Sequence, residues 1–345
     1  MTVNRRGFLR GAGAVTAAVV TGAPYIARGA GKVQLTVANG SPLKHVLSAQ
    51  GTTPWIERVK ALTNGEVEIK YFPAGQVAQL KELLRAVQNG VADIAPIPMG
   101  YVTDKMPLND VSALPGLGST SKAIVDAHAA ALKGGLLAKE FAANHIHPLY
   151  VMAFPPYQVV SMTTPIKTLA DFKGRVLRSA GGGMNLAIKA LGATPAEIPV
   201  GEMYLAMQRG TVDGTISAFA SVKGYNVQDI AKSMSANASF GTFINILSCN
   251  AERWKTLPQD IQAALTRAGT EINVSAAAFL DGETGKLEAE FKAKGMEIYN
   301  FAPDQLAAIN GKLASVQDEW VQRLAARGLP AAEALKQYRS LVKAG

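Results

Sequence analysis

From residue 33 onward, two kinds of segment alternate along the chain. In one kind every second residue is apolar, and in the other the apolar residues recur at helical spacing. The alternating segments predict strands over residues 33–38, 66–72 and 92–96. The helical spacing predicts helices over residues 52–62 and 79–88, and each is followed by an Asn-Gly pair of the kind that ends a helix. Strands that alternate with helices indicate an α/β fold with open sheets.

The sequence pattern at the end of the second predicted helix recurs 120 residues later. Residues 88–93 read Gln-Asn-Gly-Val-Ala-Asp, and residues 208–213 read Gln-Arg-Gly-Thr-Val-Asp. The shared glycine suits the left-handed position past the end of a helix, and the shared aspartate can bond nearby backbone at the turn. We therefore interpret both aspartates as structural rather than catalytic, and we expect two related lobes.

The pattern divides the chain into a signal peptide, two lobes of two segments each, and a tail. We expect these parts at residues 1–30 (signal peptide), 31–152 with about 243–280 (lobe I), 153–242 with about 281–328 (lobe II) and 329–345 (C-terminal tail or helix). Helical spacing persists over residues 258–294. A helix of that length extends about 50 Å and would bridge both lobes.

The start of the chain has the pattern of a twin-arginine export signal. Residues 4–9 read Asn-Arg-Arg-Gly-Phe-Leu, and a weakly apolar run rich in Gly, Ala and Thr follows over residues 11–23. That run is too short and too rich in small residues to span a bilayer. We therefore expect export to the periplasm and no membrane insertion of the mature chain.

The net charge and the cysteine content limit the classes of partner and cofactor that we expect. The formal net charge of +9 becomes +5 without residues 1–30, whose charged residues are four arginines. This surplus is spread out, which argues against nucleic acid and suits an anionic ligand. Cys249 is the single cysteine, so an intrachain disulfide is excluded, and its apolar neighbours predict a core thiol. We expect no cofactor and no metal.

Motifs of enzymatic chemistry are missing from the sequence. Residues 181–183 are three glycines between a predicted strand and a predicted helix, but they lack the Lys-Ser/Thr of a phosphate loop and the spacing of a dinucleotide motif. No Gly-x-Ser-x-Gly nucleophile motif is present. We expect the chain not to be an enzyme, although export of a folded enzyme by the twin-arginine route is an alternative.

Arg178 is the first candidate for ligand binding. It ends a strand-like segment and faces the glycine loop at 181–183, from which a helix starts. A guanidinium group offers a carboxylate two charge-assisted hydrogen bonds in a fixed orientation, and the free backbone N–H groups near Gly182 could help to hold the anion. A surface position or a structural salt bridge is the alternative role for this arginine.

The chain resembles the TRAP-type solute-binding proteins, the periplasmic receptors of tripartite ATP-independent transporters for organic acids. The resemblance rests on the sequence motifs at residues 83–94, 171–178, 191–195, 202–204 and 208–214. It implies a two-lobed periplasmic binding protein fold of α/β type, with hinge strands and a long helix shared by both lobes. It also implies that Arg178 is the carboxylate-binding arginine and that the partners are a small organic carboxylate and membrane permease subunits.

One departure from the family pattern bears on the ligand. Many members that bind sugar acids or dicarboxylates continue Asp-Gly with Gln-Glu-Asn, whereas Thr-Ile-Ser follows Gly214 here, so Ser217 stands at the asparagine position. A hydroxyl cannot make the paired contacts of an amide, and Phe219 and Tyr225 add aromatic surface nearby. An aromatic, branched or 2-oxo monocarboxylate is therefore expected, with a C4-dicarboxylate or a sugar acid as the alternative.

Further candidates follow the ends of predicted strands, because ligands of α/β proteins bind beyond the carboxyl ends of strands. These candidate ligand-binding residues are Asn39, His45, Tyr101, Tyr157, Gln158 and Asn245. For His45 and Tyr101, a place in the pocket and a plain structural role are equally compatible with the sequence.

Overall fold

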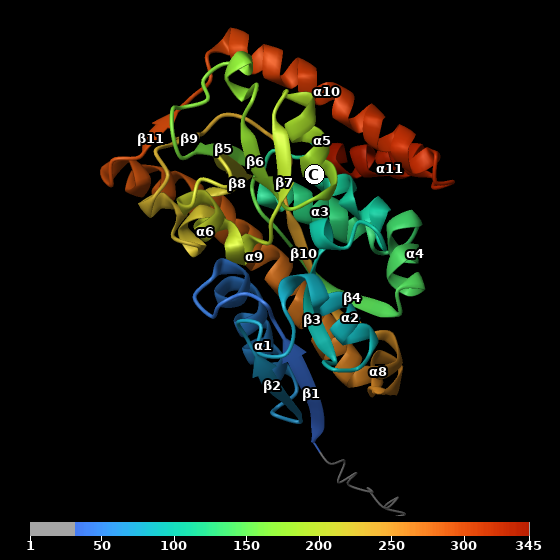
Figure 1. Cartoon of the computed structure of the whole chain (residues 1–345). Helices are drawn as coiled ribbons and strands as arrows, with labels where there is room; N and C mark the ends of the chain where they lie inside the picture. The colour runs from blue at the N-terminus through green and yellow to red at the C-terminus, as the bar shows by residue number, and fades with distance from the viewer. Residues whose placement is uncertain (1–31, 345) are drawn as a thin grey trace, which may run out of the picture. The chain divides into compact units, whose positions relative to one another are not determined.

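A computed structural model describes residues 32–344, and the predicted signal peptide lies outside the described residues. Figure 1 shows strands in two sheets with helices packed around them. The helices are α1 (Thr53–Leu62), α2 (Leu83–Gln88), α3 (Ser121–Ala131), α4 (Leu136–Ala143), α5 (Gly182–Ala190), α6 (Met203–Gln208), α7 (Phe219–Gly224), α8 (Ala251–Thr256), α9 (Gln259–Ala293), α10 (Pro303–Ala325) and α11 (Ala331–Ala344). The α/β class predicted from the hydrophobic pattern is confirmed.

The first sheet has the strand order β2-β1-β3-β10-β4. Its strands are β1 (Val33–Ala38), β2 (Val67–Phe72), β3 (Ile94–Pro98), β4 (Ile146–Ala153) and β10 (Ile244–Asn250). β1 is parallel to both β2 and β3, whereas β10 is antiparallel to both β3 and β4. The strand over 244–250 therefore comes back to the first sheet after the chain has formed most of the second.

The second sheet has the strand order β11-β9-β5-β8-β6-β7. Its strands are β5 (Gln158–Ser161), β6 (Val176–Ser179), β7 (Thr194–Glu197), β8 (Gly214–Ser217), β9 (Ser233–Ser235) and β11 (Glu297–Tyr299). β6 is parallel to β7 and β8, and β5 is antiparallel to β8 and β9. The order β7-β6-β8-β5-β9 thus repeats the order and directions of the first sheet, and β11 extends it.

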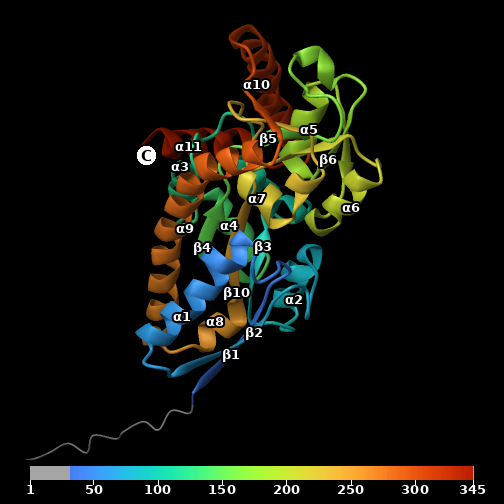
Figure 2. The same cartoon turned by 90° about the vertical axis from the view of Figure 1, so that its left-hand side faces the viewer.

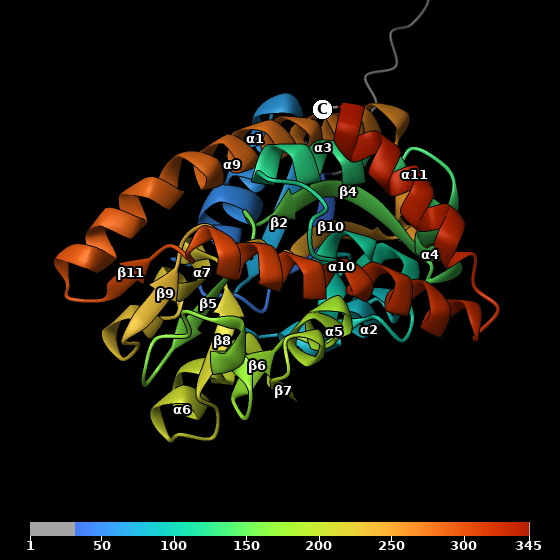
Figure 3. The ribbon, with the colours of Figure 1, turned by 90° about the horizontal axis from the view of Figure 1, so that it is seen from above.

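The helix predicted over residues 258–294 is α9, which runs without a break for 35 residues. It contacts β4 and α1 beside the first sheet and α7 beside the second, as Figure 2 shows. It also contacts β11 at the edge of the second sheet. Gly269 lets it approach β4 closely, because a side-chain carbon there would lie 2.1 Å from the carbonyl oxygen of Leu149. Two C-terminal helices add to this packing, since α10 lies on α5 and α11 lies on α3 (Figure 3).

The repeated Gly-x-x-Asp turns have the structural role that their sequence predicts. Gly90 and Gly210 adopt left-handed φ angles of 69° and 70° after α2 and α6. The Thr36 N–H donates to Asp93 Oδ2 at 2.7 Å, and the Val176 N–H donates to Asp213 Oδ2 at 2.7 Å. Each aspartate thereby ties its turn to the neighbouring parallel strand.

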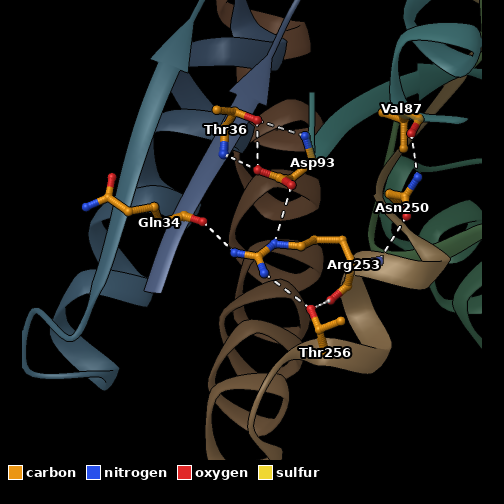
Figure 4. A network of polar contacts seen from close by, with 7 residues as sticks. All are labelled: Gln34, Thr36, Val87, Asp93, Asn250, Arg253 and Thr256. Atoms are coloured by element: carbon orange, nitrogen blue, oxygen red, sulfur yellow. Dashed lines mark hydrogen bonds and ion pairs between the residues drawn. The ribbon is translucent and has the colours of Figure 1, made fainter. Parts of the chain in front are cut away.

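Figure 4 shows the polar network around the first of these turns. Asp93 also accepts a bond from the Thr36 hydroxyl, at 2.8 Å, and pairs with Arg253 at 3.4 Å. The Asn250 side chain caps the N-terminus of α8 and donates to the Val87 carbonyl at 2.8 Å. These contacts hold β1, α2 and α8 together at the end of the first sheet.

Over residues 32–344, the buried apolar side chains form three clusters. Cys249 is buried in β10 and unpaired, as its apolar neighbours predicted. Over residues 32–344, none of the helices combines the length and the apolar character needed to cross a membrane.

Candidate functional site

A cavity lies between segments that follow strands of the two sheets. It has about 350 Å³ of empty space, part of which is open to solvent. Fifteen residues line it, namely Ser41, His45, Leu47, Leu80, Pro98, Tyr101, Phe154, Tyr157, Arg178, Ala180, Val200, Ser221, Tyr225, Phe243 and Asn245. A mainly apolar lining with a few polar groups is typical of a site for a small organic molecule.

Arg178 is the only lining residue that is charged at neutral pH. It lies in β6 and is 2% exposed. Its Nε donates to the Ile198 carbonyl at 2.7 Å, and its Nη2 donates to the Tyr101 hydroxyl at 3.0 Å. None of the ion pairs among the described residues includes it. A buried cation without a counterion is unfavourable, so the geometry is suited to receive an anion.

Tyr101 links the two lobes at this arginine. It ends the short 3₁₀ helix η3 (Met99–Tyr101) that follows β3, and its ring packs edge-on against Phe243 at 5.4 Å. Its hydroxyl oxygen accepts from Arg178 and also from the Val200 N–H at 2.9 Å. Both lone pairs are then engaged, so the phenol proton is free to donate. An anion beside Arg178 would find this hydroxyl as a second donor.

His45 contributes a neutral imidazole to the lining. Burial lowers its pKa to about 4, so the ring is uncharged above that pH. Its Nδ1 accepts from the Leu47 N–H at 3.3 Å, which places the proton on Nε2, and Nε2 has no partner among the described residues. The ring packs against Tyr225 at 4.8 Å and Phe154 at 6.4 Å.

Two further tyrosines complete an aromatic wall. Burial raises the pKa of both Tyr157 and Tyr225 above the usual value for a phenol, so both remain uncharged. The Tyr157 ring packs edge-on against Phe154 at 6.0 Å. The site therefore combines one cation with a surface that is mostly aromatic and uncharged.

The structure brings five of the ten residues predicted from the sequence to this cavity. They are His45, Tyr101, Tyr157, Arg178 and Asn245. The other five do not line this cavity.

Asn39 and Gln158 are predicted site residues whose polar groups are bonded within the protein. The Asn39 amide donates to the Thr52 hydroxyl at 3.0 Å, and its oxygen accepts from the Ser41 N–H at 2.8 Å. The Gln158 amide donates to the Ala238 carbonyl at 2.6 Å, and its oxygen accepts from the Ser235 hydroxyl at 2.8 Å. Both side chains are buried, and they hold loops in place instead of facing the cavity.

Ser217, Phe219 and Gly182 also lie outside the lining. Ser217 is buried at the end of β8, and Phe219 stacks on Phe291 of α9 at 5.8 Å. The N-terminus of α5, where Gly182 lies, is covered by the side chain of Asp110, whose Oδ2 accepts from the Gly183 N–H at 2.6 Å. The backbone donor at the start of this helix is therefore bonded to a carboxyl group of the protein itself.

Several lining residues had no signal of their own in the sequence. Phe154 and Phe243 flank the places where the chain passes between the sheets, and the Phe154 N–H donates to the Phe243 carbonyl at 3.1 Å. Ser41, Val200 and Ser221 lie in loops and short helices whose paths depend on the folded chain. Aromatic residues at the two crossings are the one pattern that could have indicated Phe154 and Phe243.

Two sheets of matching strand order, with a buried unpaired arginine in a cavity between them, have the geometry of a binding protein for a small anion. Residues 41–323 match the family described as bacterial extracellular solute-binding protein, family 7 (DctP), so the chain belongs to this family. It is 26% identical over 290 residues to the C4-dicarboxylate-binding periplasmic protein DctP of Rhodobacter capsulatus, which covers 83% of this chain and 86% of that protein.

Solved TRAP receptors have the same fold. A marine metagenome TRAP solute-binding protein specific for aromatic acid ligands, solved with 3-hydroxybenzoate, matches with a TM-score of 0.85 and 21% identity over 90% of this chain and 98% of that one. A TRAP receptor of Bordetella bronchiseptica solved with bound mandelate matches with a TM-score of 0.81 and 22% identity, over 90% and 99% of the two chains. The family, the two-lobed fold and the receptor class predicted from the sequence are confirmed, and the family consists of solute receptors, not enzymes.

Proposed function

We propose that this receptor binds a small, mainly apolar monocarboxylate through Arg178 and presents it to the membrane permease subunits of a TRAP transporter. The observation that carries the proposal is the buried guanidinium of Arg178, which lines the cavity without an acidic partner among the described residues. A carboxylate supplies the missing countercharge and accepts the forked hydrogen bonds that a guanidinium offers. The free phenol proton of Tyr101 adds a third donor.

The lining favours a monocarboxylate over a dicarboxylate. A C4-dicarboxylate would place its second carboxylate among residues that include no other cation. A buried carboxylate without a countercharge is strongly disfavoured. The relative DctP of Rhodobacter capsulatus is named for C4-dicarboxylates, so a dicarboxylate remains the alternative ligand.

The lining also disfavours a sugar acid. A polyhydroxylated ligand needs a polar partner for each buried hydroxyl. The rings of Phe154 and Phe243 and the aliphatic Leu47, Leu80 and Val200 supply no side-chain partners for hydroxyls. Their surface suits an aromatic or branched acid, and the structural neighbours with aromatic acid ligands support this choice.

A screen by thermal shift and calorimetry tests the proposal. Benzoate, phenylacetate, a branched 2-oxo acid, succinate and gluconate would each be added to the purified mature receptor. We expect an aromatic or branched monocarboxylate to raise the melting temperature most, because a ligand at 100 times its Kd stabilises the native state by about 2.7 kcal/mol. Tighter binding of succinate or gluconate than of every monocarboxylate would overturn the assignment.

The export route is part of the same proposal. The twin-arginine motif at residues 4–9 supports delivery of the folded receptor to the periplasm. Replacing both arginines by lysine should retain the protein in the cytoplasm, as cell fractionation would measure. Undiminished periplasmic protein would contradict this route.

A further inference from the structure

Three lining residues have buried polar atoms without a hydrogen-bond partner among the described residues. These atoms are Ser41 Oγ, His45 Nε2 and Asn245 Nδ2. Burying a donor without a partner costs folding free energy, so a protein rarely keeps such a group in its core without a use. Since the three atoms belong to residues around one cavity, the group that fills the cavity is the natural partner.

The unpaired donors and the cation come from different lobes. Ser41 and His45 follow β1, and Asn245 lies in β10, all next to the first sheet. Arg178 lies in β6 of the second sheet. A ligand held by Arg178 therefore meets the other donors on the opposite side of the junction between the lobes.

The chemistry of the His45 donor is fixed by its surroundings. The Leu47 N–H occupies Nδ1, so Nε2 carries the proton and can only donate while the ring is neutral. The ring also packs closely against Gly224 of the second lobe. The space between them is so small that a Cβ atom added to Gly224 would lie 2.4 Å from His45 Cδ2. A phenylalanine would fill the same space without an unpaired N–H, so packing alone does not account for the histidine.

We propose that the solute carries, besides its carboxylate, one uncharged oxygen acceptor that receives the Nε2–H of His45. The solute class is then a hydroxy-, alkoxy- or oxo-substituted aromatic or branched monocarboxylate. The acceptor is uncharged because no second cation lines the cavity. This inference rests on the proposed function, since it takes the carboxylate at Arg178 as the other end of the ligand.

Calorimetry with matched acids that differ by one oxygen tests the inference. The pairs are benzoate with 3-hydroxybenzoate, benzoate with 4-hydroxybenzoate, and phenylacetate with mandelate, because the position of the oxygen matters. For at least one pair, we expect the wild-type receptor to bind the oxygenated acid about 10- to 100-fold more tightly. In His45→Phe, the two Kd values of that pair should agree within about threefold, because the variant keeps a ring in the lining but has no N–H to donate.

The outcomes separate this inference from the proposed function. If no monocarboxylate binds the wild type, the proposed function fails. If plain acids bind but no oxygenated partner binds more tightly, or if His45→Phe keeps the preference, the proposed function stands and the role of His45 is wrong.

Nitrogen NMR of the histidine rings provides a second measurement that does not depend on a variant. Of the four histidines in the chain, His45 alone lines the cavity. We expect the protonated Nε2 resonance of one neutral histidine to shift with the preferred oxygenated acid and to stay nearly unchanged with its plain partner. Equal shifts with both acids would overturn the proposed hydrogen bond.

Discussion

Two segments of the molecule have the same framework but different chemistry. One runs from β1 to β3 in the first lobe, and the other runs from β6 to β8 in the second. In both, a helix ends at a left-handed glycine and an aspartate accepts from the adjacent parallel strand at 2.7 Å. Val37 pairs with Ile94, and Leu177 pairs with Gly214, at equivalent positions of the two frameworks. The residue that follows each is Ala38 in the first lobe and Arg178 in the second.

This difference shows how two copies of one framework can form a site in which only the second lobe supplies the cation. Ala38 is completely buried in the core of the first lobe, whereas Arg178 lines the cavity. The first lobe contributes uncharged donors instead, through Tyr101 and His45. One carboxylate needs one cation, so the second lobe can orient the ligand while the first lobe closes over it.

The comparison predicts its largest effect at Arg178. Arg178→Ala should weaken binding of the preferred acid by roughly 30-fold to several thousandfold, because losing one partner of a buried charge pair costs about 2–5 kcal/mol. Calorimetric titration measures the Kd directly. The matched control is Arg175→Ala, since Arg175 bonds the exposed hydroxyls of Thr163 and Thr164. An unchanged Kd in Arg178→Ala would remove the basis for the carboxylate site.

The two turn aspartates should differ in their contribution to stability. Asp93 accepts from the backbone and hydroxyl of Thr36 and pairs with Arg253, whereas Asp213 accepts from the Val176 N–H alone. Asp93→Ala should therefore lower the free energy of unfolding by about 2–4 kcal/mol, and Asp213→Ala by about 1–2 kcal/mol. Urea unfolding of both variants measures the difference. Equal losses would mean that the extra partners of Asp93 add nothing.

Tyr101 tests the contact that joins the two frameworks. Tyr101→Phe leaves Arg178 Nη2 and the Val200 N–H without their acceptor. We expect affinity for the preferred acid to fall about 5- to 30-fold, corresponding to about 1–2 kcal/mol. Tyr299→Phe is the matched control, because its hydroxyl donates to the Ile166 carbonyl away from the cavity. Equal losses of affinity in the two variants would show that Tyr101 acts through general stability.

Asp110 predicts a smaller, pH-dependent effect where the first lobe meets α5. Burial raises the pKa of Asp110 to about 8, so the folded protein keeps a proton that the unfolded chain loses near pH 4. Its contribution to stability is thus complete below about pH 4 and is lost as the pH rises through about 8. Asp110→Asn has no proton to lose, so its melting temperature should fall less than that of the wild type between pH 5 and 8. If the melting temperatures of the wild type and Asp110→Asn fall equally between pH 5 and 8, Asp110 does not titrate in this way.

Much of the framework follows from local pattern. Strand alternation, helical spacing and the Gly-x-x-Asp turns predicted the α/β class, the long α9 and the structural role of Asp93 and Asp213. These features depend on neighbours within a few residues, where backbone preference and apolar spacing decide the conformation. The local pattern made Arg178 a candidate, because it lies near the end of a predicted strand before a glycine loop, and the resemblance to TRAP-type receptors then favoured the ligand role over a structural one.

Half of the candidate site was decided by contacts between distant segments. Asn39 and Gln158 look available in the sequence, yet their amides donate to Thr52 and Ala238. At the glycine loop, the Gly183 N–H donates to Asp110. Tyr101 and Arg178 are 77 positions apart and meet only because the lobes come together. A buried polar group takes whichever partner the folded chain brings to it, so the type of residue is a local property, whereas its availability to a ligand depends on tertiary structure.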